Sequence, residues 1–184
     1  MNSKDWTDTS PHPWRRYGAR LTDIMLGGTV FWFLFGVIAY GVAPDAANRF
    51  FASLDGSGGR LLDLMMTVLI SVPISAAFVG ATGLSPGKWI FGVRVTRDGQ
   101  LLGFGAAFNR EVSIWIRGLG LGVPIVSLVT LANSFSRLKD KGSTQWDEAG
   151  AYVVTHRPES SGWSVAMWAT IVALIVMRIG LNAL

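Results

Sequence analysis

Charged side chains gather where the first apolar stretch of the sequence begins. Arg15, Arg16 and Arg20 precede this stretch, and Asp23 lies just inside it. On a helix, Arg16 and Asp23 share one face two turns apart, and Arg20 lies three residues before Asp23. Such a group of charges at the start of a membrane helix can form ion pairs and orient the helix in the membrane. It requires oppositely charged partners elsewhere in the chain.

Two later segments carry the charges that we expect to supply these partners. Arg110 lies in an amphipathic segment, residues 104–117, and Asp147 lies in a charged loop, residues 136–150. Asp23 is close to the start of the apolar stretch, so the group is expected at the cytoplasmic interface. We interpret it as a structural network that holds the two later segments against the first helix. The predicted members of this interfacial charge network are Arg16, Arg20, Asp23, Arg110 and Asp147.

No pattern typical of catalysis accompanies these charges. The sequence has no cysteine, no HExxH motif and no specific Ser/His/Asp arrangement. Gly87-Lys88 lacks the spacing of a phosphate-binding loop. His12 and His156 lie in polar segments, where we expect them to be solvated. We therefore expect no enzyme activity, no catalytic residue, no cofactor and no metal site.

The composition is typical of a membrane protein. Half of the residues are hydrophobic and only 15% are charged, whereas soluble domains carry about 25% charged residues. The mean hydropathy is +0.39. The net charge is +4, but the basic residues flank apolar segments and form no patch, so we expect no nucleic-acid partner.

Three apolar stretches predict membrane helices. Residues 24–43 contain no charge and match the ~20 residues that cross a hydrocarbon core, and this run is too long for a signal peptide. Residues 61–81 form a second stretch, which Pro73 is expected to kink. Residues 163–184 form a third. Residues 44–60 between the first two are predicted to be a loop.

A shorter pair of segments predicts a helical hairpin. Residues 104–117 and 125–135 are each too short to cross a membrane at ~1.5 Å per residue, and glycines with Pro124 break the chain between them. We favour a re-entrant or tilted hairpin; the competing interpretation is one full crossing. The hairpin would bring two predicted strands, residues 93–96 and 151–155, together as a small cytoplasmic sheet.

The basic residues indicate the topology. Lys and Arg number four in residues 1–20, two in 44–62, four in 82–111 and four in 136–162. The positive-inside rule places the three richer segments, and with them the N-terminus, in the cytoplasm. The predicted fold is an all-α membrane protein, a polytopic helical bundle with a small cytoplasmic β element and a Gly/Pro-broken helical hairpin.

Four blocks of the sequence resemble the RDD family of bacterial membrane proteins, which is named for one arginine and two aspartates. The blocks are residues 15–23, 85–95, 98–110 and 145–154. By this resemblance, the named residues correspond to Arg16, Asp23 and Asp147. Ala151 stands where the family usually has Thr. The resemblance implies a bacterial inner (plasma) membrane location and a proposed transport role, including cation/proton exchange.

The resemblance covers residues 12–155 and divides the chain. We expect a mobile tail over residues 1–13, an RDD-like membrane domain over 14–155, and a connector with an additional membrane helix over 156–184. On that last helix Ala166, Ala169 and Ala173 share one face, and small residues permit close helix packing in lipid. We predict that this face contacts a membrane protein partner.

Two functions are consistent with these features. A transporter requires polar groups along a path through the membrane, and the centres of the first two helices offer only hydroxyl side chains. We therefore favour a structural or accessory subunit that lies in the lipid bilayer and packs against a membrane protein. The alternative is a small-ion or solute transporter, with a small cation as its substrate.

Overall fold

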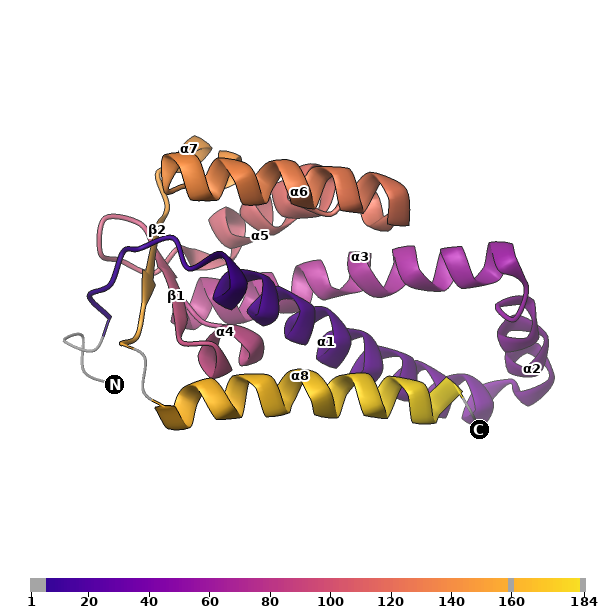
Figure 1. The fold of residues 1–184 in the computed structure, drawn as a ribbon. Helices are drawn as coiled ribbons and strands as arrows, with labels where there is room; N and C mark the ends of the chain where they lie inside the picture. Colours follow the sequence, from indigo (N-terminus) through magenta and orange to yellow (C-terminus); the bar gives the residue numbers. More distant parts are fainter. Residues whose placement is uncertain (1–5, 159–160, 183–184) are drawn as a thin grey trace.

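The computed structural model describes residues 6–158 and 161–182, and it is mostly helical (Figure 1). The helices are α1 (Pro13–Val42), α2 (Pro44–Ser53), α3 (Ser57–Thr82), α4 (Pro86–Ile90), α5 (Gly103–Ser113), α6 (Pro124–Lys141), α7 (Gln145–Ala149) and α8 (Ser161–Asn182). The strands are β1 (Val93–Thr96) and β2 (Val153–His156).

Two helices of the described part of the chain are long and apolar enough to cross a membrane. These are α1 and α3, with 30 and 26 residues. Many large apolar side chains of α1 point outward, among them Phe33 and Ile38, which are 68% and 64% exposed. Exposed apolar surface of this extent is typical of a face that contacts lipid. In α8 the described apolar stretch, Gly162–Val176, is shorter, so its crossing of the membrane stays a prediction.

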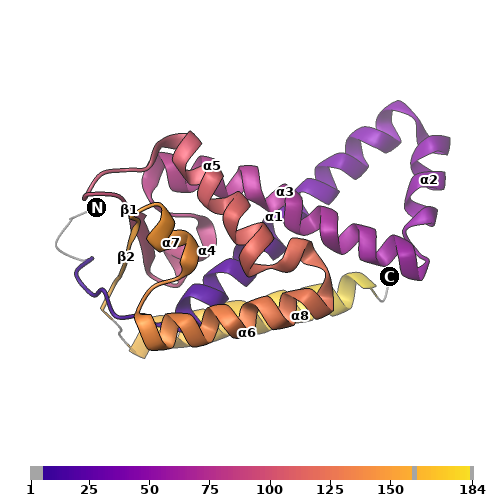
Figure 2. The ribbon, with the colours of Figure 1, turned by 90° about the horizontal axis from the view of Figure 1, so that it is seen from above.

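The small sheet lies at one end of the molecule and α2 at the other, and α1 and α3 cross between them (Figures 1 and 2). The predicted loop over residues 44–60 was wrong, because α2 occupies most of it. Pro44 is the first residue of α2, a position that suits its fixed φ. Phe50 and Phe51 then pack against Trp32 and Phe35 of α1, and this aromatic contact holds α2 in place.

The segment between β1 and β2 doubles back on itself, as the hairpin interpretation predicts. After α5 the backbone forms a π-turn and then a 3-10 turn, in which Gly120, Leu121 and Gly122 all have positive φ. A Cβ atom at Gly122 would lie 3.2 Å from the Cα of Met65, so the tip packs against the middle of α3. From there α6 returns toward the sheet (Figure 1).

The charged loop predicted over residues 136–150 is mostly helical. α6 continues to Lys141 and ends at Gly142, whose φ is 74°. The backbone N–H of Gly142 donates a hydrogen bond to the carbonyl oxygen of Leu138. This left-handed cap is a common helix stop. The short helix α7 follows at once and carries Asp147.

The predicted sheet forms, with its second strand shifted along the chain. β1 pairs antiparallel with β2, with Val93 opposite His156 and Thr96 opposite Val153. Val93, Val95 and Val154 are buried in the main hydrophobic core together with Ala76 of α3. The sheet therefore joins the two ends of the hairpin segment to the core.

The segment that precedes α1 packs against this sheet, which differs from the predicted mobile tail over residues 1–13. Trp6 is buried, and the carbonyl of Asp8 accepts a bond from the N–H of His156. Residues 1–5 of the tail lie outside the described residues.

The prediction of a solvated His156 was wrong. Its ring is fully buried and lies 4.9 Å from that of His12, centroid to centroid. His12 itself is half-buried, and its Nε2 forms a hydrogen bond with the carboxylate of Asp8. Burial, helped by the nearby charges of Arg16 and Arg15, lowers the pKa of His156 to about 3. The ring is therefore neutral at physiological pH and acts as a packing residue of the sheet.

Candidate functional site: a buried charge cluster

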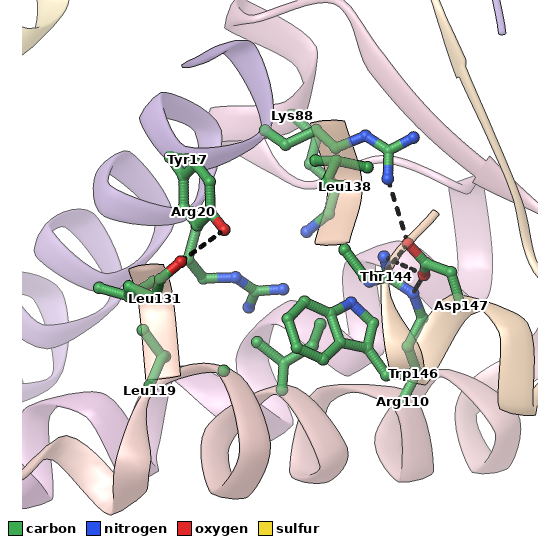
Figure 3. Close-up of a pocket in the computed structure, with 13 residues that line it drawn as sticks. Tyr17, Arg20, Lys88, Arg110, Leu119, Leu131, Leu138, Thr144, Trp146 and Asp147 are labelled. Atoms are coloured by element: carbon green, nitrogen blue, oxygen red, sulfur yellow. Dashed lines mark hydrogen bonds and ion pairs between the residues drawn. The ribbon is translucent and has the colours of Figure 1, made fainter. Parts of the chain in front are cut away.

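The predicted charge network forms the centre of a larger buried group, which we call the charge cluster. It joins α1, α4, α5 and α7 at the end of the molecule nearest the sheet (Figures 1 and 3). Its members are Arg16, Arg20, Asp23, Lys88, Arg110, Glu111 and Asp147. All five residues predicted from the sequence lie in this cluster, and two members, Lys88 and Glu111, were not predicted.

Asp147 links α7 to both α1 and α5. Its Oδ1 accepts a hydrogen bond from Nε of Arg110 at 2.9 Å and forms an ion pair with Nη2 of the same side chain at 2.8 Å. Its Oδ2 accepts bonds from Nη1 of Arg16 at 3.2 Å and from the hydroxyl of Thr144 at 2.7 Å. Asp147 is only 3% exposed, so these are charge-assisted bonds in a site with little water. They place α7 against the other two helices.

Glu111 is the second carboxylate at the centre of the cluster. Its side chain is fully buried and pairs with Nη1 of Arg20, with Nη1 of Arg110 at 3.2 Å, and with Nζ of Lys88 at 3.8 Å. One sequence signal could have found it, because Glu111 directly follows Arg110 in a segment that contains no other acidic residue. Through Glu111, α5 is joined to α1 and α4.

Asp23 attaches α4 to α1. Its Oδ1 accepts a bond from the backbone N–H of Gly87 at 2.7 Å, while the Ser85 hydroxyl and Nζ of Lys88, at 3.4 Å, contact its Oδ2. A Cβ atom at Gly87 would lie 2.2 Å from the carbonyl oxygen of Ala19, so only glycine permits this approach. The signal for these partners was the Ser-Pro-Gly-Lys sequence of the second block.

Arg15 points to a different neighbour. Its guanidinium donates to the carbonyl oxygens of Phe91, Gly92 and Arg157, at 2.8 to 2.9 Å. Adjacent residues on a helix point about 100° apart, so Arg15 reaches the sheet while Arg16 reaches α7. The paired arginines thus fix α1 to two different structural units.

The charges of the cluster do not balance. Four side chains, Arg16, Arg20, Lys88 and Arg110, are cationic, and three, Asp23, Glu111 and Asp147, are anionic. Burial lowers the pKa of the Lys88 ammonium, and the charges of Arg20 and Arg110 act in the same direction against those of Glu111 and Asp23. Among the described residues no group of three His, Cys, Asp or Glu side chains could hold a metal ion. The chemistry that this arrangement offers is charge compensation and anion binding.

A cavity of about 60 Å³ lies within the cluster (Figure 3). The four cationic side chains line it together with Tyr17, Trp146 and Asp147. Figure 3 shows Arg20 extending from α1 toward the Trp146 indole. The wall formed by Ile114, Leu119, Leu131 and Leu138 is apolar.

The predicted partner face of α8 points away from the rest of the chain. Ala166, Ala169 and Ala173 are all exposed, whereas Met167 and Leu174, on another face of the helix, are buried. α8 lies alongside α1 and contacts α4 (Figure 1). The structure therefore leaves the small-residue face uncovered by the described residues.

Comparison with known proteins identifies the family. No curated protein and no solved structure matches the chain. A family model described as "RDD family" matches residues 10–151, which contain all seven members of the charge cluster. Together with the two membrane-length helices, this match fits a membrane protein. The chain belongs to the RDD family.

Proposed function

We propose that this protein is a non-catalytic structural or accessory subunit of the bacterial inner membrane, which packs against a membrane protein partner through α8. The observation that carries the proposal is the orientation of α8. One side of the helix is buried against its own chain, while Ala166, Ala169 and Ala173 face outward. In lipid, helices associate through close van der Waals contact, and small side chains permit that approach.

The apolar surfaces of the molecule support a position within the lipid bilayer. Besides the exposed face of α1, a groove of about 890 Å³ runs between α1, α6 and α8, and its lining is mostly apolar. Leu21, Leu128 and Ile171 are among the side chains that line it. The acyl chains of membrane lipids fit such a surface, which would be unfavourable in water.

The distribution of basic residues supports the orientation with the sheet and the N-terminus in the cytoplasm. The charge cluster and the basic end of α6 lie at the same end of the molecule as the sheet (Figure 1). α2, at the other end, carries only one basic residue, Arg49. This asymmetry agrees with the positive-inside rule for a multi-pass protein.

The interior of the molecule favours a structural role over a transport path. Each carboxylate of the cluster is buried and paired with at least one cation. Where α1 crosses α3, a Cβ atom at Gly28 would lie 2.4 Å from the Thr67 side chain, and Trp32 donates to the Thr67 hydroxyl at 2.9 Å. This interface is closely packed, so the cluster is best explained as a clamp that holds α4, α5 and α7 on α1.

The test compares two pairs of substitutions on α8. Ala169→Leu with Ala173→Leu enlarges the small-residue face. Val165→Leu with Val172→Leu, two exposed positions seven residues apart on the neighbouring face, is the control pair. Each full-length variant is extracted in native lipid and its co-purifying membrane proteins are quantified. We expect the alanine pair to reduce one specific partner about tenfold, which corresponds to ~1.4 kcal/mol. Equal recovery from both variants contradicts the proposal.

Small-ion transport is the second candidate, and the cavity inside the cluster is the observation that favours it. Four cationic side chains line this cavity against one carboxylate, so its lining suits an anion better than the small cation of cation/proton exchange. Protein reconstituted into vesicles should be assayed for sodium, potassium and chloride flux. Flux that persists after Ala169→Leu with Ala173→Leu would support transport as the function independent of any partner.

A further inference from the structure

The cavity in the charge cluster has a predominantly cationic lining. The lining includes the cations of Arg16, Arg20, Lys88 and Arg110, while Asp147 is the one carboxylate among the lining residues. The other two carboxylates, Asp23 and Glu111, contact the same cations from outside the lining. An occupant of the cavity is therefore surrounded by positive charge on several sides.

The cluster as a whole carries one uncompensated positive charge when all its members are ionised, because four cations face three carboxylates. A buried charge without a counter-charge is unfavourable in a site with little water. In addition, Nε of Arg16 is buried and makes no hydrogen bond to the described residues. An anion in the cavity would supply both the missing charge and an acceptor.

The volume limits the size of that anion. A cavity holds one water for about every 10–15 Å³ of such space, so about 60 Å³ has room for a few waters or for one small inorganic anion. A nucleotide, an organic carboxylate with a long chain or a lipid headgroup is too large. We infer that the charge cluster binds one small monovalent inorganic anion, of the size of chloride, in this cavity.

Loss of the proton from Lys88 is the competing way to balance the cluster. With Lys88 neutral, three cations would face three carboxylates and the cavity would hold only water. The lowered pKa of Lys88 favours the neutral amine and so supports this alternative. The two possibilities differ in one measurable property, because only the first makes the stability of the protein depend on the identity of the anion.

The test measures thermal unfolding of the full-length protein in a non-ionic detergent, in sodium chloride, sodium bromide and sodium gluconate at constant ionic strength. Gluconate carries the same charge as chloride but is too large for the cavity. We expect the midpoint to rise with chloride or bromide and then to saturate. The rise should reach about 5–10 °C at 100 times the dissociation constant and should be absent in gluconate.

Lys88→Met provides the matched variant, since it leaves three cations and three carboxylates. Asp23 keeps Ser85 and Gly87 as partners in this variant, and Glu111 keeps its two arginines. The chloride effect should disappear in Lys88→Met and persist in Lys139→Met, which changes an exposed lysine of α6 in the same way.

Three results would overturn the inference. The first is the same midpoint in all three salts, which indicates a cavity that holds water only. The second is an unsaturated rise that gluconate reproduces, which indicates a general salt effect. The third is an undiminished chloride effect in folded Lys88→Met. If Lys88→Met does not fold, the comparison of salts on the unmodified protein decides, and none of these results depends on α8 or its partner.

Discussion

Replacing Asp147 with alanine removes the carboxylate that joins α7 to α1 and α5. The side chain accepts one hydrogen bond each from Arg110, Arg16 and Thr144, forms ion pairs with the two arginines, and is almost fully buried. Without it, the cluster holds four cations and two carboxylates. Breaking a buried ion pair on one side costs about 3–5 kcal/mol, because the remaining charge stays buried without its partner.

Asp147→Asn should cost less, about 1–3 kcal/mol, because the amide keeps the shape of the side chain and one oxygen acceptor for Arg110 while it loses the charge. Asp140→Ala is the matched control. It removes an exposed aspartate seven residues earlier in the chain, and its effect should stay within about 0.5 kcal/mol. The assay is reversible unfolding of the purified protein in detergent micelles, followed by tryptophan fluorescence.

A double-mutant cycle distinguishes loss of the ion pair between Asp147 and Arg110 from a general packing defect. Combined with Arg110→Leu, Asp147→Ala should destabilise by less than the sum of the single effects, since each change removes the same pair, and the coupling should be about 0.5–3 kcal/mol. Asp147 does not join the helices if Asp147→Ala unfolds at the midpoint of Asp140→Ala, or if the effects of Asp147→Ala and Arg110→Leu simply add.

Three further predictions concern the topology, the sheet and α4. Cysteines placed at Arg97 and Lys139 should react equally with an impermeant thiol reagent, because both ends of the hairpin return to one side; opposite accessibility would require a single crossing. The unfolded chain binds a proton at His156 near pH 6.5 and the folded chain near pH 3, so stability should be full above pH 6.5 and fall as the pH drops toward 3. His156→Leu should flatten that decline in unfolding titrations, and an unchanged slope would show that another group is responsible. Gly87→Ala should lower the unfolding midpoint, since its Cβ would collide with α1, whereas Gly105→Ala, with open space around it, should not; equal midpoints would contradict the close approach.

The elements that the sequence predicts well are those whose signal is local. The apolar lengths of α1 and α3, the glycines at the tip of the hairpin and the alternation of Val93 and Val95 each report on a few consecutive residues. The charges Arg16, Arg20 and Asp23 could be grouped because helical periodicity places them on one face. These predictions needed no knowledge of which helices are neighbours.

The features that the sequence analysis missed depend on contacts between distant segments. Glu111 and Lys88 belong to the cluster only because α5 and α4 dock against the same stretch of α1. α2 is helical where glycine and polar residues suggested a loop, because two phenylalanines find an aromatic surface on α1. His156 is buried because the segment around Trp6 covers it. No pattern of neighbouring residues reports such contacts.

One face of α1 thus positions three separate parts of the chain. Arg16 binds Asp147 of α7, Arg20 binds Glu111 of α5, and Asp23 binds the first turn of α4 through Gly87. The three side chains lie at positions i, i+4 and i+7, so they form one stripe along the helix. A one-residue insertion between them would turn part of this stripe by about 100° and break at least one attachment. The spacing of these charges, more than any single pair, is therefore what fixes the hairpin, α4 and α7 around the cavity.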